Sequence, residues 1–128
     1  MQIGDEAGLD RWEAAWKAAG SPTPHRMFTP ALLARTDVSF LTLMRNGAIQ
    51  AGCIANRSSD CVGLSNVFSA SPDVEAFAQA ADAAGATAPG LPLVGYESGE
   101  ALTQAISAGF QTIGDLRILV SRNAKFPD

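Results

Sequence analysis

The sequence predicts an α+β domain in which helices cover both faces of a mixed central β-sheet. Three strands joined by short turns occupy the middle of the chain, and after residue 70 the apolar residues recur every three or four positions, as in helices. A short apolar segment, Leu91 to Val94, interrupts this helical part and adds a strand. The 128 residues favour one domain, 1–128, and 47% apolar residues are enough to form a hydrophobic core.

Charge, chain ends and cysteines narrow the function classes. The net charge is −4 and the nine basic residues are scattered, which argues against a nucleic-acid partner. The chain has no basic-then-apolar leader and no apolar run near ~18 residues, so we expect a soluble cytoplasmic protein without membrane contact. Cys53 and Cys61 fall in predicted strands, where we expect small buried hydrophobes. A disulfide between strands or a metal site is the alternative, although zinc would need more closely spaced ligands.

The first predicted element is a helix from Leu9 to Ala19. Its apolar stripe includes Trp12 and Trp16, which lie one turn apart. Asp10 can cap the start of this helix, with Glu13 three residues further on as its partner. Core packing is one interpretation of the two tryptophans. The other is a substrate wall or a dimer contact.

A three-stranded antiparallel meander is predicted next. A proline-rich loop and a short helix, Ala31 to Arg35, lead into strands Val38 to Arg45, Ala48 to Asn56 and Cys61 to Phe68. The first two strands are joined by Asn46-Gly47, because both central positions of a type I′ turn need positive φ.

Helical spacing then replaces strand alternation. Ser71 can cap a helix that has Pro72 at its first position and that ends at Gly85. After the strand Leu91 to Val94, Ser98 can cap a further helix.

The last predicted helix has a recognisable end. Gly109 occupies the left-handed position after the helix, and Phe110 can fold back on the last turn, as in a Schellman motif. A final strand is predicted from Leu116 to Val120.

This order of elements resembles the GNAT family of N-acetyltransferases. The resemblance is most specific from Gly99 to Val120, where the helix, its Ala108-Gly109-Phe110 end and the strand beginning near Gly114 are similar to the family's last helix and strand. The family's first strand is missing here or is reduced to Met1 to Ile3. The resemblance implies transfer of an acyl group from coenzyme A (acetyl-CoA or another acyl-CoA) to an amine.

The chain departs from the family pattern at two places. Family members bind the coenzyme pyrophosphate with a loop of Arg or Gln, two residues, Gly, one residue, and Gly or Ala. This chain has Phe68-Ser69-Ala70-Ser71-Pro72-Asp73 there, without glycine or a basic residue, and Asp73 puts a carboxylate about where a phosphate would lie. These residues could instead simply begin a self-capped helix. Ala105 stands where many members carry the tyrosine that reprotonates the leaving thiolate.

The candidate catalytic residues are Tyr96 and Glu97. Both follow the strand Leu91 to Val94 at its carboxyl end, where ligands collect in sheets of this type. Glu97 could accept a proton from an amine, directly or through water, and Tyr96 could donate one. Alternatively, Glu97 is a solvated turn residue and Tyr96 packs over the helix.

The candidate binding residues come from the third strand and the loop after it. The resemblance implies that the main chain near Val67, Phe68 and Ser69 pairs with the pantetheine arm, with Ser71 in the loop that corresponds to the pyrophosphate site. Asn66 is a polar residue in an apolar strand, so it could bind a ligand's amide groups or satisfy local backbone.

Three hypotheses follow for function. The first is a GNAT-like N-acyltransferase acting on a small-molecule amine, without a metal. The second is a catalytically inactive relative that binds a small molecule or a partner chain in the same cleft. The third is a structural module whose open sheet pairs with a second copy to form a homodimer, because an unpaired edge invites another strand.

Overall fold

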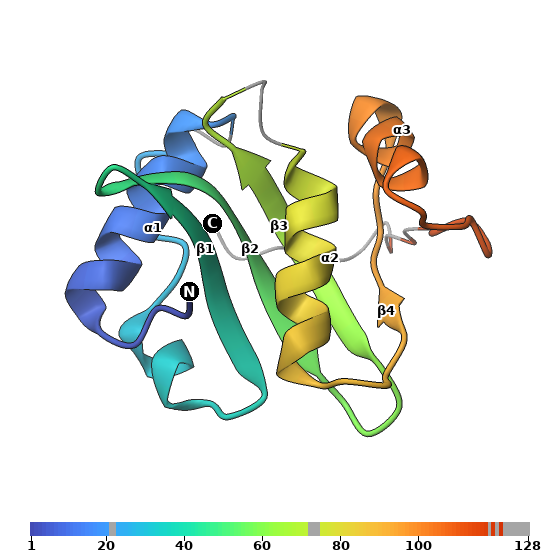
Figure 1. Ribbon diagram of the computed structural model, residues 1–128, viewed down its shortest axis with the longest axis horizontal. Coiled ribbons are helices and arrows are strands. Elements are labelled where there is room, and N and C mark those ends of the chain that lie inside the picture. The colour runs from blue at the N-terminus through green and yellow to red at the C-terminus, as the bar shows by residue number, and fades with distance from the viewer. Residues whose placement is uncertain (21–22, 72–74, 118, 120, 122–128) are drawn as a thin grey trace.

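The computed structural model describes residues 1–20, 23–71, 75–117, 119 and 121. Its sheet has four strands in the order β1-β2-β3-β4, with helices on both faces (Figure 1). The fold class predicted from the sequence is confirmed. The elements in chain order are α1 (Glu6–Ala18), the 3₁₀ helix η1 (Pro30–Ala34), β1 (Val38–Arg45), β2 (Ala48–Arg57), β3 (Val62–Ser69), α2 (Ala76–Thr87), β4 (Leu93–Val94) and α3 (Gly99–Ser107).

The sheet is mixed. β1, β2 and β3 form the expected antiparallel meander, and β4 pairs in parallel with β3. The hairpin between β1 and β2 turns at Asn46 and Gly47, whose φ angles of 52° and 78° fit the type I′ turn. These strands begin and end within two residues of the predicted positions.

The start of the chain supplies a short partner for β1. Gln2 bridges to Leu41, and the Ile3 N–H donates to the Phe40 carbonyl at 2.8 Å. The family's first strand is therefore reduced here to a bridge at residues 1–3, which is one of the two expected outcomes.

The two faces of the sheet carry different cores. α1 and η1 cover one face over a largely aromatic cluster, and α2 covers the other over small and aliphatic side chains. The first cluster is built around Leu9, Trp12, Phe40, Ile54 and Phe68, and the second around Leu41, Cys53, Val62, Leu64, Ala80 and Ala84.

The start of α1 corrects the sequence prediction. Asp5, not Asp10, is the N-cap, and its Oδ1 accepts the Gly8 N–H at 2.7 Å. Asp10 lies inside the helix and pairs with Arg26 at 2.7 Å. The helix begins earlier because residues 1–3 are fixed on β1, so the chain turns away from the sheet at Asp5.

The bounds of α2 also differ from the prediction. The helix continues through Gly85 to Thr87, since a Cβ at Gly85 would touch nothing and its backbone is helical. At the other end α2 begins at Ala76. The predicted Pro72 start lies outside the described residues.

The end of α3 is the predicted Schellman motif. The Phe110 N–H donates to the Ala105 carbonyl at 3.1 Å, and the Gly109 N–H donates to the Ile106 carbonyl at 3.0 Å. Gly109 has φ 106°, and Phe110 packs against the core beneath α2. This local signal was sufficient to predict the corner.

The final predicted strand is wrong for the residues that the structure describes. Leu116, Arg117 and Leu119 belong to no strand, whereas Ile118 and Val120 lie outside the described residues. An isolated strand is not stable without a partner, and the described edge strand β4 has only two residues.

Candidate functional site

The candidate site is a cleft that opens where β3 and β4 separate. Two register pairs join the strands, Val62 with Leu93 and Gly63 with Val94. Beyond them β3 continues to Ser69, while the chain after Val94 turns toward α3, which stands away from the sheet in Figure 1. The cleft between them has a volume of about 1180 Å³. This opening lies at the carboxyl end of β4, where the sequence placed the candidate catalytic residues.

Gly95 sets the distance between the walls of the cleft. A Cβ at this position would lie 2.8 Å from the Leu64 carbonyl oxygen, which is closer than real Cβ contacts. Because the neighbour is backbone, it cannot rotate away as a side chain would. Glycine therefore lets the segment after β4 pass close to β3 before it diverges toward Tyr96.

A β-bulge shapes the β3 wall. Gly52 of β2 pairs with Phe68, but Ile54 pairs with Ser65, so β3 carries one extra residue. Asn66 lies in this bulge with φ 53°, and its Nδ2 donates to the Ser65 Oγ at 3.2 Å.

The bulge changes which side chains face each layer. Leu64 and Val67 are three residues apart, yet both pack in the α2 cluster, and Phe68 is buried in the α1 cluster. A bulge also disrupts the strand ladder and leaves the extra residue unpaired. The wall of the cleft therefore offers main-chain groups at Asn66 as well as side chains.

Tyr96 and Glu97 lie together on the opposite wall, after β4. Both line the cleft; Tyr96 is 76% exposed and Glu97 is half-buried. Burial raises the pKa of the Glu97 carboxyl above its usual value. A carboxylate with a raised pKa is a better proton acceptor than a fully solvated one, which suits a general base.

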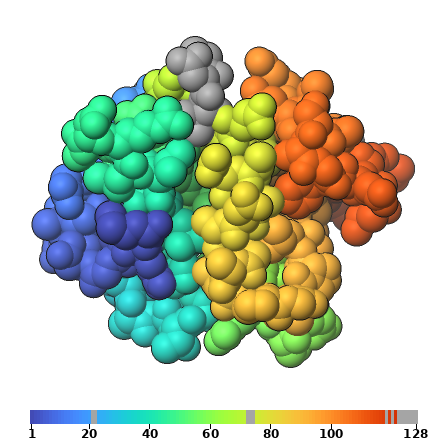
Figure 2. Space-filling model, in the orientation of Figure 1, coloured from blue at the N-terminus to red at the C-terminus, as the bar shows by residue number. Residues whose placement is uncertain are grey.

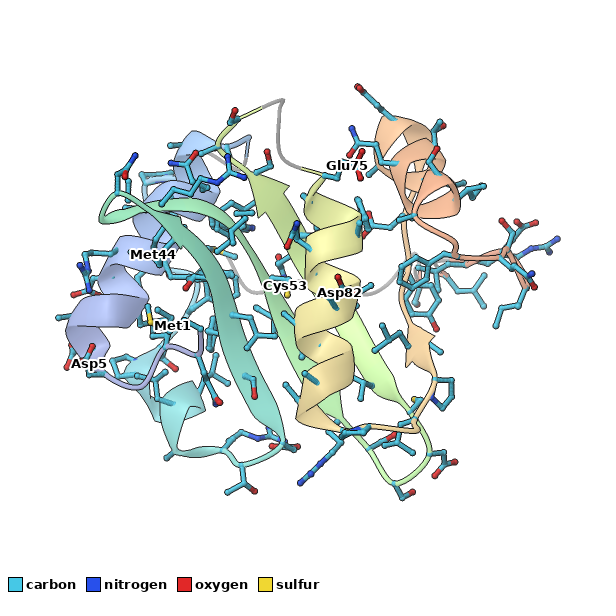
Figure 3. The ribbon with its side chains drawn as sticks, in the orientation of Figure 1. Met1, Asp5, Met44, Cys53, Glu75 and Asp82 are labelled. Atoms are coloured by element: carbon cyan, nitrogen blue, oxygen red, sulfur yellow. The ribbon has the colours of Figure 1, made fainter. Side chains whose placement is uncertain are left out.

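The charge of the cleft is one-sided. Three carboxylates, Glu75, Glu97 and Glu100, are among its lining residues, and no lining residue in the described part of the chain is Lys, Arg or His. Glu75 lies at the start of α2, on the side that faces α3 (Figure 3).

The negative charge of the lining bears on the prediction that the chain binds coenzyme A. The pantetheine arm is uncharged, and its binding beside the main chain of β3 stays a prediction. The phosphates do not fit this lining, because a cationic partner is missing from the described residues and the carboxylates repel them. Pro72 and Asp73, in the loop discussed above, lie outside the described residues.

The structure brings together most of the residues singled out in the sequence. Those that line the cleft are Trp16, Asn66, Val67, Phe68, Ser69, Tyr96 and Glu97. Ser71 is described but does not line the cleft; its N–H donates to the Ser69 Oγ at 3.2 Å. Of the expected pyrophosphate loop, the structure describes Phe68 to Ser71, and the role of the loop stays a prediction.

Trp12 lies apart from the cleft, in the core. It is fully buried, and its Nε1 donates to the Leu41 carbonyl at 3.1 Å. Trp16, one turn later, stacks on Trp12 with ring centroids 6.5 Å apart and lines the cleft. Of the two tryptophans, only Trp16 can contact a ligand there.

Sequence reasoning missed Gly95 and the carboxylates Glu75 and Glu100. The two carboxylates were visible as acidic residues at helix starts, which usually means only that they are exposed. The fold places them on one cleft because α2 and α3 both begin at its rim.

Other features of the described residues bear on earlier alternatives. Cys53 and Cys61 are free thiols, and burial raises the pKa of Cys53 to about 11. In the described part of the chain, acidic, His and Cys side chains form no group of three that could hold a metal ion. No described helix is long and apolar enough to cross a membrane.

Solved structures share the fold of this chain. The aminoglycoside N-acetyltransferase AAC(6')-Iy, in complex with the bisubstrate analogue CoA-S-monomethyl-acetylneamine, superposes with a TM-score of 0.73 at 16% identity, covering 95% of this chain and 96% of that chain. The same enzyme in complex with CoA gives a TM-score of 0.72 at 16% identity, over 95% and 98% of the two chains.

A third structure is a presumed acetyltransferase from Agrobacterium tumefaciens, with a TM-score of 0.68 at 13% identity over 94% and 99% of the two chains. No family model matches the sequence, and no curated protein matches it in sequence. The chain has the GNAT fold, as a divergent example of it.

Proposed function

We propose that this protein is an acyl-CoA-dependent N-acyltransferase that acts on a small-molecule amine. The observation that carries this proposal is the cleft at the divergence of β3 and β4, in a fold shared with N-acetyltransferases solved with coenzyme A. We also propose that it works in the cytoplasm, which its two free cysteines support.

In this proposal, the β3 wall of the cleft binds the substrates and the wall after β4 transfers protons. Main-chain groups of Val67 to Ser69 would hold the pantetheine arm, and Asn66 and Trp16 would contact the acceptor. The amine nitrogen attacks the thioester carbonyl and gives its proton to Glu97, directly or through water, while the departing thiolate takes a proton from Tyr96. Most of the rate acceleration would come from positioning the two substrates.

The raised pKa of Glu97 gives this mechanism a pH dependence. The base must be deprotonated, so transfer should fall as the pH drops through the Glu97 pKa, which lies above its ordinary 4.5. Glu97→Gln should abolish this acidic limb together with most of the activity, a loss of roughly 10²-fold or more.

The test has two steps. Thermal unfolding with acetyl-CoA detects binding, since a ligand at 100 times its dissociation constant adds about 2.7 kcal/mol to stability. Release of free thiol in the presence of a panel of amines then detects transfer. Glu97→Gln should keep the thermal shift and lose thiol release, whereas Glu100→Gln, on the same cleft, should keep both.

One observation favours a second candidate, a catalytically inactive binding module. The described lining holds three carboxylates without a basic residue, and Ala105 replaces the expected tyrosine. Such a module would bind a cationic small molecule. Stabilisation by amines without any effect of acetyl-CoA would support it and would reject the acyltransferase.

A further inference from the structure

Glu13 is a buried carboxylate that the proposed chemistry does not use. It lies in the middle of α1, is 7% exposed and does not line the cleft. Burying a charge is costly unless the group is paired and hydrogen-bonded. The partners of Glu13 therefore indicate what this residue does.

Those partners belong mainly to the loop that follows α1. The Glu13 Oε1 accepts the Phe28 N–H at 2.8 Å, and the two carboxylate oxygens lie 3.2 and 3.3 Å from the Met27 nitrogen. Lys17, one turn later, pairs with Glu13 at 3.0 Å and donates to the His25 carbonyl at 2.8 Å. Charge-assisted hydrogen bonds of this kind are strong, so one ion pair fixes the main chain of residues 25–28 to α1.

The fixed loop places Phe28 against Trp16. The two rings meet edge to face with centroids 4.9 Å apart, which is a geometry that aromatic pairs prefer. Trp16 lies three residues after Glu13, so both side chains are on one side of α1. Trp16 also lines the cleft. The position of its ring in the cleft thus depends on Phe28, and the position of Phe28 depends on Glu13.

We propose that Glu13 is a positioning residue that holds Trp16 in the wall of the cleft by fixing residues 25–28, and that it thereby sets the affinity for the acceptor amine. This role rests on the function proposed above, in which Trp16 contacts the acceptor. α1 and α3 lie on opposite sides of α2 in the space-filling view (Figure 2), and Glu13 contacts the first of these two sides. Substitution of Glu13 should therefore change acceptor binding and not proton transfer at Glu97.

Quenching of tryptophan fluorescence by acrylamide tests the position of Trp16 without any substrate. Trp12 is fully buried, so the quenchable emission comes from the half-buried Trp16. Glu13→Ala removes every contact of the carboxylate and should steepen the quenching. Glu13→Gln keeps one oxygen for the Phe28 N–H and should lie between Glu13→Ala and the wild type. If Glu13→Ala does not fold, Glu13→Gln alone is compared with the wild type. Quenching that stays at the wild-type level in the folded variants overturns the proposal.

Steady-state kinetics tests the consequence for the acceptor, with the amine of the panel that gives the fastest thiol release. Glu13→Ala should raise the KM for this amine roughly tenfold and leave kcat and the KM for acetyl-CoA nearly unchanged, because it removes binding that the ground state and the transition state share. An unchanged amine KM, or a fall in kcat of the same size, overturns the proposal. If no amine gives thiol release with the wild type, the proposed function fails, and quenching alone decides whether Glu13 positions Trp16.

Two control variants separate positioning from a general loss of stability. Ala84→Gly weakens α2 in the other core and should lower the midpoint of urea unfolding. Asp10→Asn removes the exposed ion pair with Arg26, which also joins α1 to the loop but should contribute little. Both variants should keep the wild-type quenching and the wild-type amine KM. An increase in either control as large as that in Glu13→Gln overturns the proposal.

Discussion

The face of the sheet under α1 and the edge of the sheet at β4 differ in how closely their residues are packed. Under α1, Trp12 meets the edges or faces of Phe28, Phe40 and Phe68 with ring centroids 5.3, 5.0 and 5.2 Å away. At the β4 edge, only two residues pair with β3, and the next side chain along, Tyr96, is 76% exposed.

The difference separates folding from binding. Aromatic pairs in a dry core contribute stability beyond the area that they bury. The β4 edge leaves backbone and side chains accessible, which costs stability but allows a ligand to approach. Substitutions under α1 should therefore change the free energy of unfolding, and substitutions at the β4 edge should mainly change binding.

The largest expected effect comes from Trp12→Ala. The change removes a fully buried ring and leaves the Leu41 carbonyl without its donor. We expect a loss of about 3–5 kcal/mol in the free energy of unfolding, measured by urea denaturation. Tyr96→Ala is the matched aromatic control at the other edge, where we expect less than about 0.5 kcal/mol. Equal losses of unfolding free energy in the two variants would contradict the separation of a stabilising face from a binding edge.

Gly52→Ala tests the same core from the strand beneath it. A Cβ at Gly52 would lie 2.6 Å from two Phe68 ring carbons and 2.8 Å from the Trp12 Nε1. Overpacking of this kind should destabilise the protein by about 1–3 kcal/mol. The readout is the midpoint of urea unfolding.

Gly85→Ala provides the control for Gly52→Ala. Gly85 lies inside α2 with open space at its Cβ position, so alanine should stabilise the helix by about 0.5–1 kcal/mol. The two glycine substitutions should thus have opposite signs. A neutral Gly52→Ala would mean that the aromatic cluster can move away from β2.

Glu13 attaches the loop after α1 to the same core. It is 7% exposed and accepts the Phe28 N–H at 2.8 Å, with Lys17 Nζ 3.0 Å away. Burial raises its pKa, but the hydrogen bonds from Phe28, Lys17 and Met27 outweigh burial, so the pKa lies below the ordinary 4.5. Folding therefore favours the charged form. This contribution is complete above pH 4.5 and is lost as the pH falls through the lowered pKa.

Glu13→Gln should lower stability by about 1–2 kcal/mol at about pH 7 and by less at about pH 3. Urea unfolding at the two pH values measures the difference. Asp82→Asn, at an exposed position on α2 (Figure 3), is the control and should change neither value. A deficit that does not shrink in acid would show that the charge of Glu13 contributes little.

Local signals in the sequence predicted the parts of the fold that neighbouring residues determine. Asn46-Gly47 specified the hairpin, and Gly109-Phe110 specified the end of α3, because each places positive φ at a fixed position. The N-cap of α1 was missed because Asp5 and Asp10 both precede apolar residues at helical spacing. The contact of residues 1–3 with β1 decides between them.

The candidate site was predictable only in part, for the same reason. Tyr96 and Glu97 could be placed at a strand end, and they do line the cleft. The bulge at Asn66 depends on pairing with β2, and the gathering of Glu75 with Glu100 depends on how α2 and α3 sit at the rim. Such features arise from contacts between distant parts of the chain, which residue patterns do not encode locally.

A substitution that should change binding more than stability separates the two regions most directly. Gly95→Ala would place a Cβ 2.8 Å from the Leu64 carbonyl oxygen, so the segment that carries Tyr96 and Glu97 must move outward. Since β4 makes only two register pairs, we expect a loss of about 1 kcal/mol or less. Affinity for acetyl-CoA, measured by calorimetry, should nevertheless fall about tenfold, because a tenfold change needs only ~1.4 kcal/mol of misplaced contact.

Gly4→Ala, with open space at its Cβ, is the control for both measurements. If Gly95→Ala instead unfolds the protein as readily as Gly52→Ala, then the β4 edge is part of the same cooperative core. Substitutions of residues that line the cleft would then also lower the free energy of unfolding. The separation of a stabilising face from a binding edge would have to be given up.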